Sequence, residues 1–274
     1  MSQPIQHKGF RLMKCKLCLE KEDIQVSHII PDAFFRFVKG KEKYEIGKYI
    51  EVSQSGNKFA QESYAEPLLC RECEQKFSNE FESYVIELVL RNPKKVGASS
   101  SRGIKKVTFR NLDYRKLKLF QMSLLWRAAI SSLDFYKYVE LDPIIVELLR
   151  KNLNKLTPLE PHILPCFMDR VFIDIPNENA SFSELKLSKS TIFNPKKTTS
   201  KILGIEFVTF FFGGLEWRFW LHKCSDFFIN ENKVISPSGV LVCSIQNIGK
   251  NDLLLGAGVL ARGNELKGKG LNRP

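Results

Sequence analysis

The chain has 274 residues, 43% of them hydrophobic with 21 Phe, a composition that excludes a largely disordered protein. Lys and Arg outnumber Asp and Glu by 42 to 30, and the formal charge of +12 favours contact with polyanions such as nucleic acid. A solvated basic surface is the simpler alternative. The length predicts two domains, which we place at residues 1–93 and 94–274.

The N-terminal residues MSQPIQHKGF contain no apolar core of a secretory signal. The most apolar window, Ile202 to Leu221, contains three charged residues and many aromatic ones, which argues against a membrane span and favours a hairpin. We therefore expect a cytoplasmic protein with no membrane segment. Four of the seven cysteines form two close pairs, a pattern typical of metal binding in a reducing compartment rather than of a disulfide framework.

The first cysteine pair, Cys15 and Cys18, precedes a short alternating strand at residues 24–26 that leads into Ser27-His28-Ile29-Ile30-Pro31. Residues 32–38 predict one or two helical turns, and the polar residues 39–66 predict an inserted hairpin or long loop. The second pair, Cys70 and Cys73, runs into a helix of about four turns, because apolar residues recur there at helical spacing. Asn92-Pro93 is expected to end this helix.

Residues 94–106 are rich in Lys, Gly and Ser and predict a linker. A second helix is expected from near Leu112 to Ile130, apolar on most sides and therefore buried, and Asp142-Pro143 predicts the start of a third. Strands follow beyond Pro165, including a hairpin that turns at Gly213-Gly214. The larger domain is thus expected to be α+β, with helices first and mainly antiparallel strands after them.

Two C-x-x-C pairs can each present two thiolates to one tetrahedral zinc ion. We therefore predict that Cys15, Cys18, Cys70 and Cys73 bind one structural zinc that fastens the N-terminal module. A redox C-x-x-C or buried free thiols are the alternatives. The 51 residues between the pairs are too many for a simple zinc ribbon, so the metal is expected to hold a more elaborate unit.

The order of cysteine pair, strand ending in His, insertion, cysteine pair and helix resembles the HNH family of metal-dependent nucleases. The resemblance covers residues 12–90 and is carried by C15-K-L-C18, S27-H28-I-I-P31 and L68-L-C70-R-E-C73-E74. It implies a zinc-containing treble-clef, or ββα-metal, module. It further implies that the protein hydrolyses phosphodiester bonds of nucleic acid, with DNA the favoured substrate.

By position in the HNH pattern, His28 would be the general base that activates a water molecule. Many family members have an acidic residue where this chain has Ser27 and a metal-binding His where it has Glu74. Glu74 would then help to hold a catalytic Mg²⁺ or Mn²⁺, since hard cations prefer oxygen ligands. The alternatives remain open: His28 as a packing residue, Glu74 as an acidic residue at a helix start, and the whole chain as a non-catalytic nucleic-acid-binding or scaffold protein with a degenerate site.

Residues 116–129 and the segment LDPIIVELLRKNL resemble the companion domain of bacterial HNH-like proteins associated with anti-phage defence, which implies a homo-oligomer or a partner in a defence complex. Arg127 within this apolar helix is expected either to form a core ion pair or to contact phosphate. The aromatic hairpin FFFGGLEWRFW is expected to pack in the core, with base stacking as the alternative. We interpret His162 and His222 as structural or surface residues. The three remaining cysteines are expected to be core thiols: Cys166, Cys224 and Cys243.

Overall fold

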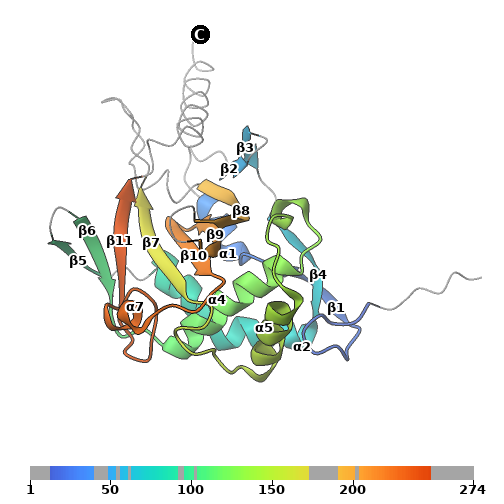
Figure 1. The fold of residues 1–274 in the computed structure, drawn as a ribbon. Helices are drawn as coiled ribbons and strands as arrows, with labels where there is room; N and C mark the ends of the chain where they lie inside the picture. The colour runs from blue at the N-terminus through green and yellow to red at the C-terminus, as the bar shows by residue number, and fades with distance from the viewer. Residues whose placement is uncertain are drawn as a thin grey trace, which may run out of the picture.

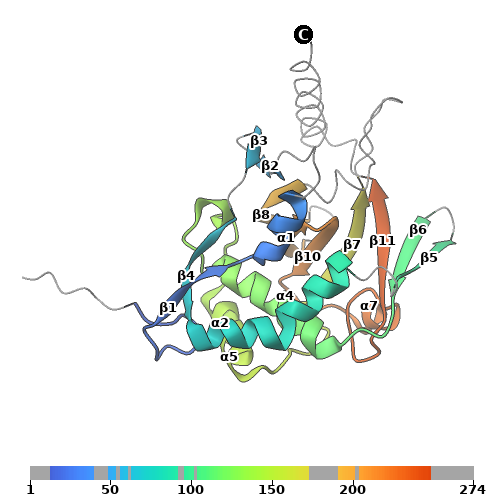
Figure 2. The ribbon, with the colours of Figure 1, turned by 180° about the vertical axis from the view of Figure 1, so that it is seen from behind.

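The computed structural model of the chain describes residues 13–39, 49–53, 56–60, 63–91, 96–101, 104–172, 191–200 and 204–247. The fold is α+β, as expected. Within the described residues, two strands form a separate small sheet and nine strands form one large sheet. The small sheet and two strands of the large sheet, β7 (Cys166–Phe172) and β11 (Leu241–Asn247), lie at opposite ends of the molecule, with helices between them (Figures 1 and 2).

The strands are β1 (Ile24–His28), β2 (Tyr49–Ser53), β3 (Gly56–Ala60), β4 (Ala65–Cys70), β5 (Val96–Ser101), β6 (Ile104–Phe109), β7 (Cys166–Phe172), β8 (Thr191–Thr199), β9 (Glu206–Phe212), β10 (Leu215–Trp220) and β11 (Leu241–Asn247). The helical segments are α1 (Asp32–Lys39), α2 (Arg71–Phe77), η1 (Ser78–Glu82), α3 (Ser83–Ile86), η2 (Glu87–Arg91), α4 (Tyr114–Ala129), η4 (Asp134–Tyr136), α5 (Pro143–Lys155) and α7 (Asp226–Asn230).

Strands β1 and β4 pair antiparallel, so that His28 lies opposite Ala65 and Ile24 lies opposite Cys70. The chain continues from β4 directly into α2. The helix predicted after the second cysteine pair is confirmed and runs from Arg71 to Arg91. It contains two π-helical turns, η1 and η2, which the sequence pattern did not indicate.

Helix α4 is the central helix of the protein. The Asp113 side chain accepts a hydrogen bond from the Lys116 N–H at 3.0 Å and so caps its start, and residues 117–128 are all buried. Helices α5 and α3 and the π-turn η1 pack against it. Helix α5 starts as predicted, with Asp142 capping it and Pro143 in its first turn.

The large sheet has the strand order β3-β2-β8-β9-β10-β7-β11-β6-β5. Most neighbours are antiparallel, as expected, whereas β2–β8 and β11–β7 are parallel. The prediction of a linker at residues 94–106 is wrong, since β5 and β6 form an edge hairpin there. An edge pair is held by backbone hydrogen bonds and tolerates the polar, Gly-containing sequence that suggested a linker. Within the predicted insertion at 39–66, β2 and β3 form a hairpin.

Aromatic side chains connect the N-terminal segment to the large sheet. The ring of Phe34 in α1 lies 4.9 Å from that of Phe212 in β9, which stacks on Trp217 in β10 at 5.1 Å. Trp217 in turn packs on Phe120 of α4 at 5.6 Å. These hairpin aromatics therefore serve the core. The buried core includes residues on both sides of position 93, and a domain boundary there stays a prediction.

None of the helices in the described part of the chain is both long and apolar enough to cross a bilayer.

Candidate metal centre and strand-end histidine

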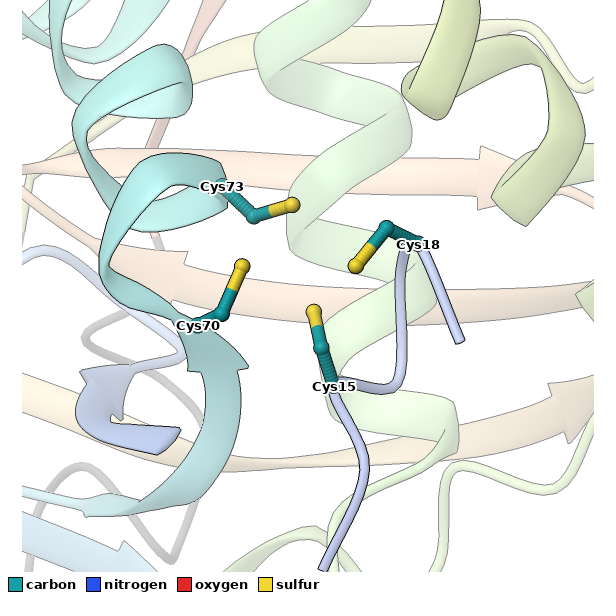
Figure 3. A group of neighbouring side chains, drawn as sticks. All are labelled: Cys15, Cys18, Cys70 and Cys73. Atoms are coloured by element: carbon teal, nitrogen blue, oxygen red, sulfur yellow. The ribbon is translucent and has the colours of Figure 1, made fainter. Parts of the chain in front are cut away.

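The first cysteine pair lies in a tight turn that precedes β1. The Leu19 N–H donates to the Cys15 carbonyl at 3.0 Å, and the Cys15 N–H donates to the Lys21 carbonyl at 2.8 Å. Leu19 has a φ of +65°, a left-handed conformation that is uncommon for a residue with a side chain. The turn brings Cys18 back beside Cys15 (Figure 3).

Three other elements hold this turn in place. The Lys16 N–H donates to the Leu68 carbonyl of β4 at 2.9 Å. Arg150 of α5 donates to the Leu17 carbonyl at 2.7 Å. Lys21 forms an ion pair with Glu72 of α2. The first cysteine pair is thereby fastened to the elements that carry the second pair and to α5.

The second cysteine pair spans the junction of strand and helix. Cys70 is the last residue of β4 and has extended backbone angles, φ −69° and ψ 161°, whereas Cys73 lies in the first turn of α2. The change from strand to helix brings the two thiols to the same side of the chain (Figure 3).

The four sulfur atoms of the two pairs converge, and all lie within 4.8 Å of one another. Cys15, Cys70 and Cys73 are buried and Cys18 is partly exposed. Tetrahedral zinc with Zn–S bonds of about 2.3 Å needs sulfurs about 3.8 Å apart, so a small contraction would close the site around the ion. The donor set and its closed, four-cysteine arrangement fit structural zinc.

The acidities of Cys18, Cys70 and Cys73 differ. Burial raises the pKa of Cys18, but backbone hydrogen bonds at Lys21 and Glu20 outweigh it and lower that pKa to about 7. Burial raises the pKa of both Cys70 and Cys73, and the neighbouring cysteines raise that of Cys73 further. Since zinc binds thiolates, binding would release protons from the second pair.

His28 ends β1 with its side chain half-buried. Its Nε2 lies 3.0 Å from Ser63 Oγ and 3.8 Å from Asp32 Oδ1. Burial lowers the pKa of His28, and the cation Arg127 adds to this effect while Asp32 opposes it. The imidazole is therefore mainly neutral at pH 7. A ring hydrogen on Nε2 would face Ser63 Oγ and the Asp32 carboxylate and would leave the lone pair on Nδ1 to accept a proton.

Glu74 contacts the residue that precedes His28. The buried Ser27 donates from Oγ to Glu74 Oε2 at 2.7 Å. Among the described residues, no hydrogen bond or ion pair joins His28 to Glu74. The structure thus brings the four cysteines together, whereas the joint action of His28 and Glu74 on a phosphodiester stays a prediction.

The described residues contain one candidate metal centre. Among the described residues, the four cysteines are the only group of three or more His, Cys, Asp or Glu side chains arranged to hold a metal ion. Glu74 alone could still bind Mg²⁺, which keeps several waters and often uses one or two carboxylates.

Three residues of this region were not identified from the sequence as neighbours of His28. Asp32 follows it by four residues and starts α1, a spacing that could have indicated the contact. Ser63 comes close to His28 through the pairing of β1 with β4, and no sequence pattern indicated this contact. Arg127 forms the core ion pair that was one of its two expected roles, with Glu82 as partner at 2.5 Å.

The remaining cysteines and histidines differ in burial. Cys166, Cys224 and Cys243 are buried, His162 is partly buried and His222 is exposed.

Comparison of the chain with protein-family models, with curated proteins and with solved structures finds no match.

Proposed function

We propose that this chain is a zinc-containing, HNH-like protein that hydrolyses phosphodiester bonds of nucleic acid, with DNA as the favoured substrate. The observation that carries the proposal is the position of His28. It is a neutral, half-exposed imidazole at the end of a strand, and β1–β4 pairing fixes that strand beside the four-cysteine site. Two antiparallel strands, the second leading into a helix with one cysteine pair at the junction, are the arrangement that a treble-clef or ββα-metal module requires.

Phosphodiester hydrolysis needs a base that activates water and a cation that neutralises charge on the phosphate. The lone pair on His28 Nδ1 would take a proton from water as the water oxygen attacks phosphorus and the bond from phosphorus to the leaving oxygen breaks. Asp32, 3.8 Å from Nε2, would stabilise the imidazolium that forms. A bound Mg²⁺ or Mn²⁺ would neutralise charge on the phosphate, and Glu74 is the carboxylate we assign to it.

The test is cleavage of supercoiled plasmid in Mg²⁺ or Mn²⁺ by the wild type and by His28→Ala. His222→Ala, at an exposed histidine of the other part of the chain, is the matched control. Loss of a general base lowers the rate about 10²- to 10⁴-fold, and we expect that loss for His28→Ala alone, with zinc content unchanged. Equal cleavage by the wild type and His28→Ala would remove the nuclease proposal.

A second candidate function is nucleic-acid binding without cleavage. Two observations favour it: Glu74 already accepts a hydrogen bond from Ser27, and the described residues offer no second metal-holding group. The net charge of +12 supplies the attraction. Binding of labelled DNA that weakens steeply with salt, together with no cleavage in Mn²⁺, would establish this function instead.

A further inference from the structure

A buried ion pair connects helix α4 to the backbone of His28. Arg127 lies on α4 and is 1% exposed. One guanidinium nitrogen donates to the His28 carbonyl at 2.6 Å, and another donates to Glu82 Oε1 at 2.5 Å. The guanidinium also lies 5.7 Å from the centre of the Phe77 ring. One arginine thus joins α4, the end of β1 and the helix that follows the second cysteine pair.

Glu82 reaches this arginine because of the π-helical turn. Glu74 and Glu82 are eight residues apart, which in a regular α-helix separates their directions by about 80°. The wider π-turn η1 holds one extra residue, so the two directions come within about 20° of each other. Both carboxylates therefore face the β1 side of the helix, where Glu74 contacts Ser27 and Glu82 contacts Arg127.

Stability alone does not account for this pair. Burial raises the pKa of Glu82, and the Arg127 charge opposes that effect, so the pair exists at a cost in desolvation. Apolar residues of similar size often replace such a buried pair with no loss of stability. What an apolar pair could not supply is a hydrogen-bond donor aimed at the His28 carbonyl.

We propose that Glu82 and Arg127 are positioning residues for His28: Arg127 fixes the backbone at the end of β1, and Glu82 fixes Arg127, so that the imidazole keeps its place against Ser63 and Asp32. The role of His28 in catalysis rests on the proposed function. The placement of its imidazole by Arg127 and Glu82 does not depend on that function. The charged groups that act on the ring are Asp32 and Arg36 from α1, Arg127 from α4 and Glu82 from η1.

The geometry also explains why arginine is required. A guanidinium offers several N–H groups in a rigid plane, so it can donate to a carbonyl and a carboxylate at once in fixed directions. A lysine in the same place has a single nitrogen on a flexible stem and would hold one partner well at the expense of the other.

The test uses the full-length, zinc-loaded protein and three variants: the double apolar variant E82L/R127M, the conservative R127K, and R115M as control. Arg115 and Glu80 make an ion pair between the same two helical segments at 3.0 Å, but on the surface. The first readout is the ¹H–¹⁵N spectrum of the His28 imidazole, which reports its tautomer. The second is plasmid cleavage, resolved into kcat and KM.

We expect E82L/R127M to fold and to retain zinc but to differ from the wild type in the tautomer balance of His28. We expect its kcat to fall about 10²-fold with KM little changed, because small misplacement of a catalytic group has that effect. R127K should lie between it and the wild type, and R115M should match the wild type. If E82L/R127M fails to fold, the His28 tautomer and the kcat of R127K test the inference in its place. A wild-type His28 spectrum in the decisive variant would overturn the inference. A wild type that does not cleave would instead end the nuclease proposal, while the spectrum would still test the positioning.

Discussion

Replacing Gly213 with alanine tests how the β9–β10 hairpin sits on the N-terminal segment. Gly213 is the first residue of the two-residue turn and has a φ of +65°. A Cβ atom there would lie 3.1 Å from Val89 Cγ1 and 3.2 Å from Phe34 Cδ1. The substitution therefore adds two costs, an unfavourable backbone conformation and a steric contact with α1 and η2.

Gly204→Ala separates these costs, because Gly204 has a φ of +64° but no atom within 4 Å of the place that a Cβ would take. A left-handed alanine costs about 1–2 kcal/mol, and the smaller entropy of the unfolded chain returns about 0.4–1 kcal/mol. We expect Gly204→Ala to lower the free energy of unfolding by about 1 kcal/mol. Crowding in the core adds about 1–3 kcal/mol, so Gly213→Ala should lower it by about 2–4 kcal/mol.

Urea denaturation followed by tryptophan fluorescence measures both values, since Trp217 lies next to the turn in β10. Equal effects of the two substitutions would refute the packing of the hairpin turn on Phe34 and Val89. A larger effect of Gly213→Ala would support a single cooperative unit that includes α1 and the large sheet.

Three further predictions concern buried polar groups. Lys118 donates to the Ile163 and Leu164 carbonyls, and burial lowers its pKa to about 8 from 10.5. Between pH 8 and 10 the Lys118 amine is mainly protonated in the unfolded chain and mainly neutral in the folded chain. The free energy of unfolding should therefore rise by on the order of 2 kcal/mol from pH 8 to pH 10 through this group. Lys118→Met should remove this rise when denaturation is measured at the two pH values. Glu66 accepts hydrogen bonds from the Ser132 N–H and Oγ, so Glu66→Ala should cost about 1–3 kcal/mol in thermal unfolding, whereas Glu22→Ala, at an exposed site, should cost little. Arg150→Ala frees the Leu17 carbonyl and should weaken zinc affinity about tenfold in a chelator competition, with the exposed Lys151→Ala as control.

Features with a local chemical cause could be predicted from the sequence. Asp142-Pro143 marked the start of α5, and Gly213-Gly214 marked the hairpin turn, because a few neighbouring residues determine each geometry. The convergence of the four sulfurs was indicated differently: each C-x-x-C pair offers two ligands, and tetrahedral zinc needs four.

Features that depend on tertiary contacts could not be predicted. The polar segment 94–106 forms strands because β11 offers it a pairing edge, which the segment itself does not reveal. Arg127 pairs with Glu82 because the π-turn η1 changes the direction of the Glu82 side chain, and no sequence pattern predicted that turn.

The most direct test of the account is the metal content and sulfur coordination of the purified protein. We predict one zinc ion per chain, with X-ray absorption giving four sulfur ligands at about 2.3 Å, and loss of that ion in Cys73→Ser. A wild-type chain that binds no zinc when purified under reducing conditions, or a zinc ion whose ligands are not these four sulfurs, would contradict it.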